Sequence, residues 1–389
     1  GAGAGPESPQ GRARGGAGAG PSGAGAGGGA RPRDPAPWFE AQQARQSLIT
    51  GAASDVELLE LLDPAAIGGF TYVNVSTAFH RLAKLAAAGE DGARRRVLSS
   101  AAFRALEERL RELPRLPARN AANIMWAFGS LRHFPPPGLW ERLEAAFVDG
   151  STRASPQNLS NALWACAVLG VRPSEELLAS AVEVVRATGA EFEARNVSIV
   201  VWALAKASGP GGEVDRAVAG MLDDLQVQAG AAGLAGFSAQ NLANTAWGLG
   251  VMGHRLRPEL VAALRERLRE EGFVERAFSP QNVANLLWGL AKAPGGGEAV
   301  GGELLLGVFA EYVERNSAAL NAQNVSDLLY AFAALGSDAS VLDSVRRSSV
   351  VQALASDYRR LRSEMQPGFA SDGLDGLALL GLQHVIHPS

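Results

Sequence analysis

The stretch QNVANLLWGLAKA, residues 281–293, is one of six versions of a single phrase that recurs along the chain. In each version an asparagine is followed six residues later by a tryptophan or, in the last copy, by a tyrosine. Successive asparagines are 38, 38, 45, 41 and 42 residues apart, a period typical of stacked supersecondary units. The repeated pairs are Asn120 and Trp126, Asn158 and Trp164, Asn196 and Trp202, Asn241 and Trp247, Asn282 and Trp288, and Asn324 and Tyr330.

The phrase itself has the pattern of a capped helix. In the second copy Ser155 is a favourable N-cap, Pro156 suits the first helical position, and Gly170 suits the position after the last turn. Ser279 and Pro280 repeat this start, whereas Gly250 and Gly336 repeat the stop. These start and stop residues predict a first helix in each repeat.

A second amphipathic segment follows each first helix, for example at residues 173–186 and 258–271. Glycine-rich segments at 209–212 and 295–302 are interpreted as linkers that absorb the variable repeat length. No segment alternates between apolar and polar residues as a strand does. We therefore predict an all-α fold, specifically an α-solenoid, a superhelix of stacked helix-turn-helix repeats.

Four regions are expected. Residues 1–36 are rich in Gly, Ala, Pro and Arg, which predicts a disordered leader, either a transit-peptide remnant or low-complexity filler. Residues 37–115 should hold N-terminal helices and a degenerate capping repeat, in which Asn74 and His80 take the asparagine and tryptophan positions. Residues 116–345 form the tandem repeats, and residues 346–389 should form C-terminal capping helices and a tail.

Composition limits the possible functions. The formal net charge is −4, and residues 120–389 carry 21 basic and 28 acidic side chains, so bulk electrostatic attraction to nucleic acid is not expected. The single cysteine, Cys166, rules out an internal disulfide framework. The histidines, His80, His133, His254, His384 and His387, are scattered, and no phosphate-binding loop or nucleophile elbow occurs. We expect no metal, no cofactor and no catalysis by this chain.

One strip of the first helix carries polar side chains at the spacing i, i+4, i+7, i+11. In the fifth copy it comprises Gln281, Asn285, Trp288 and Lys292. The three lysines of the protein, Lys84, Lys206 and Lys292, all fall at the last of these positions.

Two interpretations of this strip remain open. In the structural one, tryptophan packs against the next repeat, asparagine bonds across repeats, and lysine complements the helix dipole. This interpretation suits the invariant positions, because a residue that is identical in every repeat cannot distinguish different bases. In the functional one, the variable polar positions bind a ligand.

The repeated phrase P-Q-N-[LV]-[AS]-N-x-x-W-[AG]-x-[AG] closely resembles the octotricopeptide repeat family and the related helical repeats of FAST-kinase-like and RAP-domain proteins. The resemblance covers residues 70–335. It implies an α-solenoid that binds organellar RNA and acts in transcript processing, stability, editing or translation.

We therefore expect a non-catalytic protein that binds single-stranded RNA in an organelle, the mitochondrion or alternatively the chloroplast. Amides and arginines of the strip would contact bases, and lysines would contact phosphates. The competing expectation is a protein–protein scaffold within an RNA-processing complex, without membrane insertion. The candidate RNA-binding residues are Lys84, Arg119, Asn123, Gln157, Asn161, Arg195, Lys206, Gln240, Asn244, Gln281, Asn285, Lys292 and Gln323.

Overall fold

The computed structural model describes residues 37–208 and 215–383. The predicted leader, the glycine-rich segment at 209–212, and His384 and His387 lie outside these residues. Within the described part of the chain all regular structure is helical, which confirms the all-α prediction. The chain forms two compact units, which divide between Phe147 and Val148, inside the expected repeat array.

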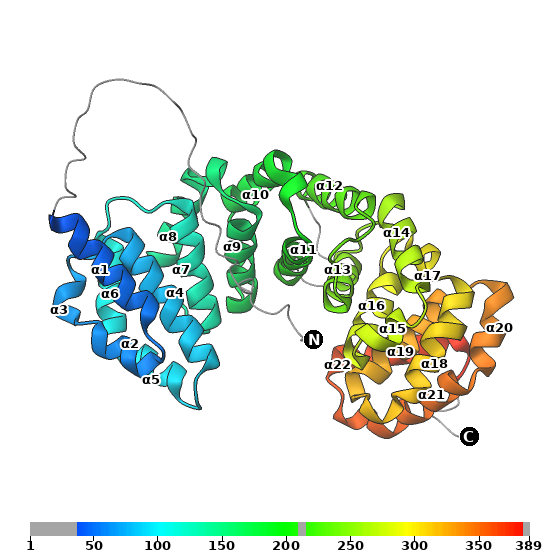
Figure 1. The fold of residues 1–389 in the computed structure, drawn as a ribbon. Helices are drawn as coiled ribbons and strands as arrows, with labels where there is room; N and C mark the ends of the chain where they lie inside the picture. The colour runs from blue at the N-terminus through cyan, green and yellow to red at the C-terminus, as the bar shows by residue number, and fades with distance from the viewer. Residues whose placement is uncertain (1–36, 209–214, 384–389) are drawn as a thin grey trace. The chain divides into compact units, whose positions relative to one another are not determined.

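The unit that ends at Phe147 contains a helix array around α4. Helix α4 packs against α1 and α7, and α6 packs against α3, α4 and α5 (Figure 1). The rings of Phe79, Phe103 and Phe128 meet in its core, with Phe79 centroids 5.3 and 5.2 Å from the other two. The helices are α1 (Pro37–Gly51), α2 (Asp55–Leu61), α3 (Pro64–Ile67), α4 (Tyr72–Ala88), α5 (Ala93–Ser99), α6 (Ala101–Glu112), α7 (Ala118–Ser130) and α8 (Leu139–Asp149).

The unit that begins at Val148 has the two layers of a solenoid. Helices α9, α11, α13, α16, α19 and α22 pack in succession, and α10, α12, α14 and α17 form the second layer (Figure 1). The helices are α9 (Pro156–Leu169), α10 (Glu175–Thr188), α11 (Ala194–Ser208), α12 (Arg216–Ala231), α13 (Ala239–Val251), α14 (Pro258–Arg269), α15 (Phe273–Ala277), α16 (Pro280–Lys292), α17 (Gly296–Glu303), α18 (Ala310–Arg315), α19 (Ala322–Leu335), α20 (Ala339–Arg347), α21 (Ser349–Leu361) and α22 (Pro367–Leu380).

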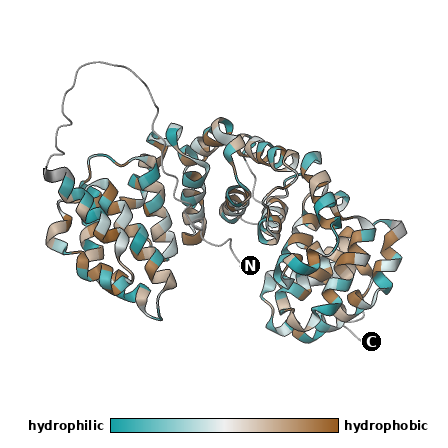
Figure 2. Cartoon of the chain, in the orientation of Figure 1, coloured by the Kyte–Doolittle hydropathy of each residue, from teal (hydrophilic) through white to brown (hydrophobic). Residues whose placement is uncertain are grey.

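Apolar residues, brown in Figure 2, recur along these helices, and many of them are buried. In α16, for example, Val283, Leu286 and Leu290 are all buried. Burial of such side chains is the main stabilising contribution to helix stacking, roughly 1.5–3 kcal/mol for each fully buried aliphatic side chain. The packed faces are the physical basis of the repeat.

The anchoring asparagine has a structural role at the start of several first helices. Helix α9 begins at Pro156 after Ser155, and the predicted capping is confirmed: the Ser155 hydroxyl accepts from the Asn158 N–H, and the Asn158 Oδ1 accepts from the Ser155 N–H. Reciprocal bonds of this kind satisfy backbone groups that a helix terminus leaves unpaired. The same box forms at α4, α13 and α19.

The same asparagine also links neighbouring repeats. Asn196 Nδ2 donates to the Ser160 hydroxyl over 3.3 Å, and Asn241 Nδ2 donates to the Ser198 hydroxyl over 3.0 Å. Each serine lies two residues after the anchoring asparagine of the preceding repeat. The structural interpretation of the asparagine, a hydrogen bond across repeats, is therefore confirmed at these two junctions.

Two glycine predictions were wrong. Gly250 does not end its helix, because α13 continues to Val251 and Gly253 has the positive φ of 59°. A Cβ on Gly250 would lie 2.5 Å from the Gly289 carbonyl oxygen, so close helix packing is what requires glycine there. The predicted linker at 295–302 is mostly helix α17, with a non-helical residue at Gly301.

Candidate nucleic-acid interface

The candidate site is a cavity on the first-helix layer of the unit that begins at Val148. Its volume is about 630 Å³, within the range of ligand pockets. Residues of α11, α13, α16, α19 and α22 line it, so five consecutive first helices contribute to one surface. We call it the lysine cavity; its lining includes Lys206, Trp247, Trp288, Lys292, Gln323, Asp327, Phe369 and Asp372.

Both lysines of this unit lie over aromatic rings of the repeat signature. Lys206 Nζ is 6.0 Å from the ring centroid of Trp202 in its own helix and 5.1 Å from that of Trp247 in the next repeat. Lys292 Nζ is 5.5 Å from the Trp288 centroid and 3.8 Å from that of Tyr330. Cation–π attraction of this kind contributes roughly 0.5–2 kcal/mol and holds the ammonium groups over the cavity wall.

The pKa values of the two lysines shift in opposite directions. Burial lowers the pKa of Lys206. Burial also acts to lower the pKa of Lys292, but the hydrogen bond and charge of Asp372 outweigh it and the net pKa is raised. Lys292 Nζ lies 2.8 Å from Asp372 Oδ1, and the Trp288 indole N–H donates to Asp372 Oδ2 over 3.1 Å. One carboxylate on α22 therefore neutralises the ammonium group of α16.

A second carboxyl, Asp327, forms part of the same wall and is only 5% exposed. Gln323 Nε2 donates to its Oδ2 over 3.3 Å. Burial, and then the negative charge of Asp372, raises the pKa of Asp327 to about 7, although Gln323 and Lys292 act in the opposite direction. Near neutral pH the cavity can therefore exchange a proton at this position.

The aromatic residues at the tryptophan position of the repeat divide into a buried group and a half-buried group. Trp126, Trp164 and Trp202 are buried, which agrees with the structural interpretation of packing between helices. His80, at the tryptophan position of the degenerate copy, lies 4.8 Å from the Trp126 ring centroid, and burial, with Lys84 and Arg81, lowers its pKa to about 4. Trp247, Trp288 and Tyr330 are half-buried, and the first two line the lysine cavity.

The polar side chains three residues after the anchoring asparagine are more buried than side chains on a base-contacting surface would be. Asn161, Asn244 and Asn285 are 0%, 2% and 2% exposed. A helical wheel gives the direction of a side chain but not what covers it, and here adjacent first helices pack closely over this flank. The preceding position is more accessible: Gln157 is exposed, and Arg195, Gln240, Gln281 and Gln323 are half-buried.

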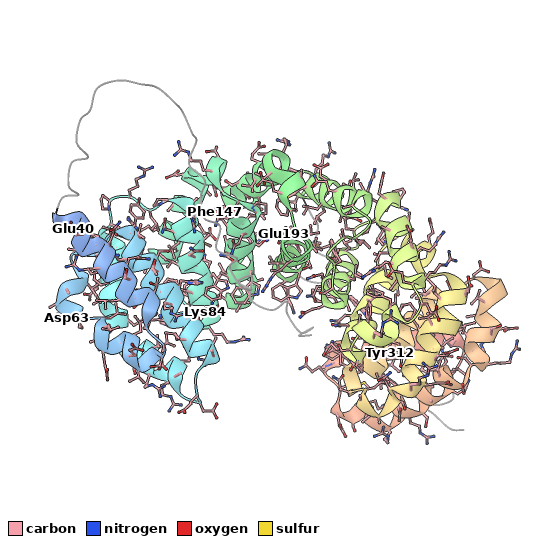
Figure 3. The ribbon with its side chains drawn as sticks, in the orientation of Figure 1. Glu40, Asp63, Lys84, Phe147, Glu193 and Tyr312 are labelled. Atoms are coloured by element: carbon pink, nitrogen blue, oxygen red, sulfur yellow. The ribbon has the colours of Figure 1, made fainter. Side chains whose placement is uncertain are left out.

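Three candidates belong to the other unit. Lys84 on α4, labelled in Figure 3, and Arg119 on α7 are exposed, and Asn123 on α7 is half-buried. The structure therefore brings together Lys206, Lys292 and Gln323 in the lysine cavity, and it describes Lys84, Arg119 and Asn123 within a separate unit.

Sequence reasoning missed the contribution of α22. Aligned with α16, the stretch QPGFASDGLDGLALLG at residues 366–381 is a further degenerate copy, with Pro367 at the first helical position and Gly376 at the position of Gly289. Asp372 then occupies the position of Asn285. The proline and the glycine were the available signal; phenylalanine in place of the anchoring asparagine and aspartate in place of tryptophan concealed it.

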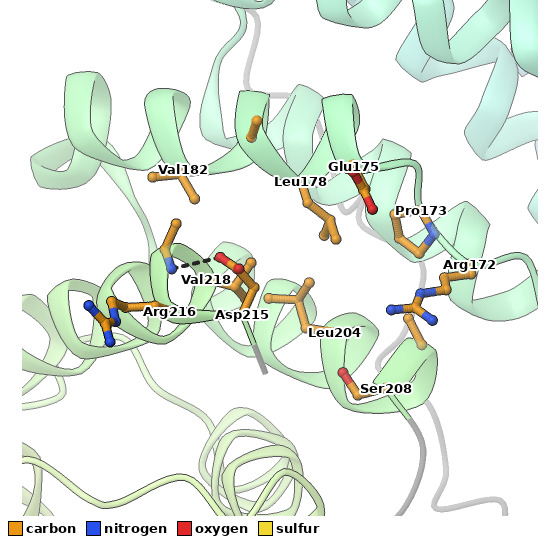
Figure 4. Close-up of a pocket in the computed structure, with 13 residues that line it drawn as sticks. Arg172, Pro173, Glu175, Leu178, Val182, Leu204, Ser208, Asp215, Arg216 and Val218 are labelled. Carbon is orange, nitrogen blue, oxygen red and sulfur yellow. Dashed lines mark hydrogen bonds between the residues drawn. The ribbon is translucent and has the colours of Figure 1, made fainter. Parts of the chain in front are cut away.

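A larger cavity of about 880 Å³ is lined by residues of α10, α11 and α12 (Figure 4). Arg172, Glu175 and Arg216 line it, and Asp215 caps α12 by accepting from the Ala217 N–H over 2.7 Å. None of the sequence-predicted residues lines this cavity. Its lining residues Ser208 and Asp215 adjoin residues 209–214, outside the described part of the chain, so it offers no defined site.

Neither a membrane-spanning helix nor a metal-binding cluster is found in the described residues. Across residues 37–208 and 215–383 no helix is both long enough and apolar enough to cross a membrane. In the same residues, histidine, cysteine, aspartate and glutamate side chains do not gather in groups of three or more that could hold a metal ion.

One known protein family is similar to part of this chain. The family described as the Tbc2 translation factor, N-terminal domain, matches residues 138–296. This range runs from just before α8 to the start of α17 and includes four of the six repeated phrases. No curated protein matches the chain. The chain is therefore a helical-repeat protein with a central region similar to a translation-factor domain.

Proposed function

We propose that this chain binds single-stranded RNA in an organelle and acts in the post-transcriptional use of that RNA, most directly its translation, without catalysis of its own. The organelle we propose is the mitochondrion, with the chloroplast as the alternative. The single observation that carries the proposal is the lysine cavity, where one wall presents two lysines, two partly accessible tryptophans and a glutamine.

The chemistry of this wall suits RNA because RNA combines phosphates with flat bases. Lysines supply charge for phosphates, and accessible indole rings can stack on unpaired bases, an interaction worth about 1–3 kcal/mol per base. The lining comes from five successive repeats, so a strand can extend along consecutive first helices rather than occupy an isolated pocket. The resemblance to octotricopeptide repeats and the similarity to a translation-factor domain over residues 138–296 support the same proposal.

One observation favours the second candidate function, a protein–protein scaffold in an RNA-processing complex. Asp372 already neutralises Lys292 at 2.8 Å, which leaves less positive charge for phosphates. The excess of acidic over basic side chains in residues 120–389 acts in the same direction. A scaffold would use the same first-helix layer to hold a partner helix.

Crosslinking in isolated organelles, followed by sequencing of the attached RNA, tests the choice. RNA binding predicts a small set of enriched transcripts and crosslinked peptides from α11, α13 and α16. Recovery of protein partners with no enriched transcript would exclude RNA contact as the primary function and support the scaffold. Imaging of the tagged native protein would decide between the two organelles.

A further inference from the structure

The most informative group in the lysine cavity is the carboxyl of Asp327. It is 5% exposed, yet within the described part of the chain a single hydrogen bond, the 3.3 Å one from Gln323 Nε2, is made to it. Asp372 on the same wall has two shorter bonds, from Lys292 and from Trp288. A buried carboxylate is stable only when donors satisfy its oxygens. Asp327 therefore has acceptor capacity that a ligand with N–H groups would fill.

The rest of the wall limits what that ligand can be. The lining contains two lysines and two aspartates, so the cavity has no strong preference for a net charge. Trp247, Trp288 and Phe369 provide apolar, flat surface. These features favour an uncharged aromatic ring that offers N–H donors on one edge and stacks against indole on its faces.

The four RNA bases differ in the N–H donors that their edges offer to a carboxylate. Uracil offers one N–H between two carbonyl oxygens, which a carboxylate repels. Adenine and cytosine each offer an exocyclic amine beside a ring nitrogen that is an acceptor. Guanine alone places two donors, N1–H and the 2-amino group, side by side, which matches the two oxygens of a carboxylate. Its O6 is an acceptor, and Gln323 and Lys292 are donors on the same wall.

We propose that the lysine cavity is a guanine-selective subsite, in which Asp327 accepts hydrogen bonds from the guanine edge and the neighbouring tryptophans flank the ring. This assignment rests on the proposed RNA-binding function and adds base identity to it. It also gives Asp327 a role that helix packing does not require, because the five preceding copies of the phrase have asparagine or isoleucine at the same position.

Selection from a pool of random single-stranded RNA tests the assignment, with wild-type protein, Asp327→Asn and the control Asp375→Asn compared. Asp375 is an exposed carboxylate on α22 and does not line the cavity. We expect one position of the selected RNA to be enriched in guanine with the wild type and the control. With Asp327→Asn, whose amide offers one donor and one acceptor, guanine enrichment at that position should disappear while the protein remains folded.

A second measurement addresses the contact itself. Replacing that guanine by inosine removes only the 2-amino group, so affinity for wild type should fall roughly tenfold, and affinity for Asp327→Asn should change little. Guanine enrichment that survives in Asp327→Asn, or RNA binding without any guanine-enriched position, would overturn the subsite and leave the proposed function standing. Absence of RNA binding by the wild type would overturn the proposed function as well.

Discussion

At the start of a first helix, one asparagine joins the local capping box to the neighbouring repeat. Asn241 accepts from the Ser238 N–H through Oδ1 and donates to the Ser198 hydroxyl through Nδ2. Its Oδ1 also accepts from the Ser238 hydroxyl, so three hydrogen bonds, one of them between helices, depend on one side chain. The residue is repeated because any shorter or branched replacement loses at least one of them.

The first prediction follows from these bonds. Asn241→Ala should lower the free energy of unfolding by about 1–3 kcal/mol, because a cap and a cross-repeat bond are both lost. Asn158→Ala is the matched control: the same box forms at Asn158, but the serine position of the preceding repeat holds Ala122, which offers no hydroxyl. Urea denaturation of both variants measures the difference, and equal losses would contradict the cross-repeat contribution.

The second prediction concerns Asp327 and pH. Burial first, and Asp372 second, raises the pKa of this carboxyl from 3.8 to about 7. Between these values the folded protein retains a proton that the unfolded chain has released, so the contribution of Asp327 to stability falls as pH rises from about 4 to about 7. Asp327→Asn cannot titrate. We expect it to be more stable than wild type above pH 7 and similar near pH 4.

Thermal unfolding at several pH values between 4 and 8.5 measures this effect. The informative quantity is the stability difference between Asp327→Asn and wild type, since other groups titrate equally in both proteins. That difference should grow with pH and level off above about 7. A difference that stays constant over the whole range would show that Asp327 keeps an ordinary pKa in the folded protein.

At the scale of helices, the small residues after each tryptophan set how closely neighbouring first helices approach. A Cβ on Gly289 of α16 would lie 2.3 Å from the Ala246 carbonyl carbon and 2.4 Å from the Trp247 nitrogen, both backbone atoms of α13. Backbone cannot move aside as a side chain can. The repeated phrase therefore has alanine or glycine after the tryptophan because neighbouring first helices lie close together there.

Gly289→Ala should therefore destabilise the protein by about 1–3 kcal/mol through overpacking. Gly220→Ala provides the opposite case, because a Cβ at this exposed position of α12 meets nothing within 4 Å. There the gain in helix propensity should stabilise the protein by roughly 0.5–1 kcal/mol. Denaturation curves of the two variants should shift in opposite directions, and a shared direction would refute the close contact between α13 and α16.

Helix α22 supplies a test of charge in the lysine cavity. Its Asp372 carboxylate competes with any phosphate for Lys292, to which it is bonded at 2.8 Å. Asp372→Asn should strengthen RNA binding and steepen its dependence on salt by up to about one phosphate contact. Fluorescence anisotropy with a labelled RNA at several salt concentrations measures both. Unchanged or weaker binding would indicate that Lys292 does not face phosphate and would favour the scaffold.

The same helices show what sequence can and cannot predict. The bounds of α9 follow from Ser155, Pro156 and Gly170, because capping is a local property. The burial of Asn161 depends instead on which helices cover it, and a wheel contains no such information. Asp372 was missed for a related reason: its repeat has lost the anchoring asparagine and the tryptophan, and only packing beside α19 reveals its place.

Considered as a whole, the molecule has too little positive charge to bind RNA through bulk attraction. Its net charge is −4. Its three lysines are Lys84, Lys206 and Lys292, which occupy the same repeat position in three different copies. Any phosphate contact in the lysine cavity must therefore come from individual side chains. Lys206 lines this cavity beside Trp247, so a phosphate contact made by its ammonium group should be visible in the salt dependence of binding.

Lys206→Gln is the corresponding prediction. Loss of one phosphate contact to a single strand should reduce the slope of log affinity against log salt by about 0.7 and weaken binding most at low salt. The glutamine keeps much of the side-chain length over Trp202 and Trp247 but loses the cation–π attraction, so the free energy of unfolding should fall by no more than about 2 kcal/mol. Arg216→Gln, an exposed charge on α12 outside the lysine cavity, is the control and should leave the slope unchanged. Equal slopes for Lys206→Gln and wild type would show that RNA, if bound, follows another surface of the helical stack.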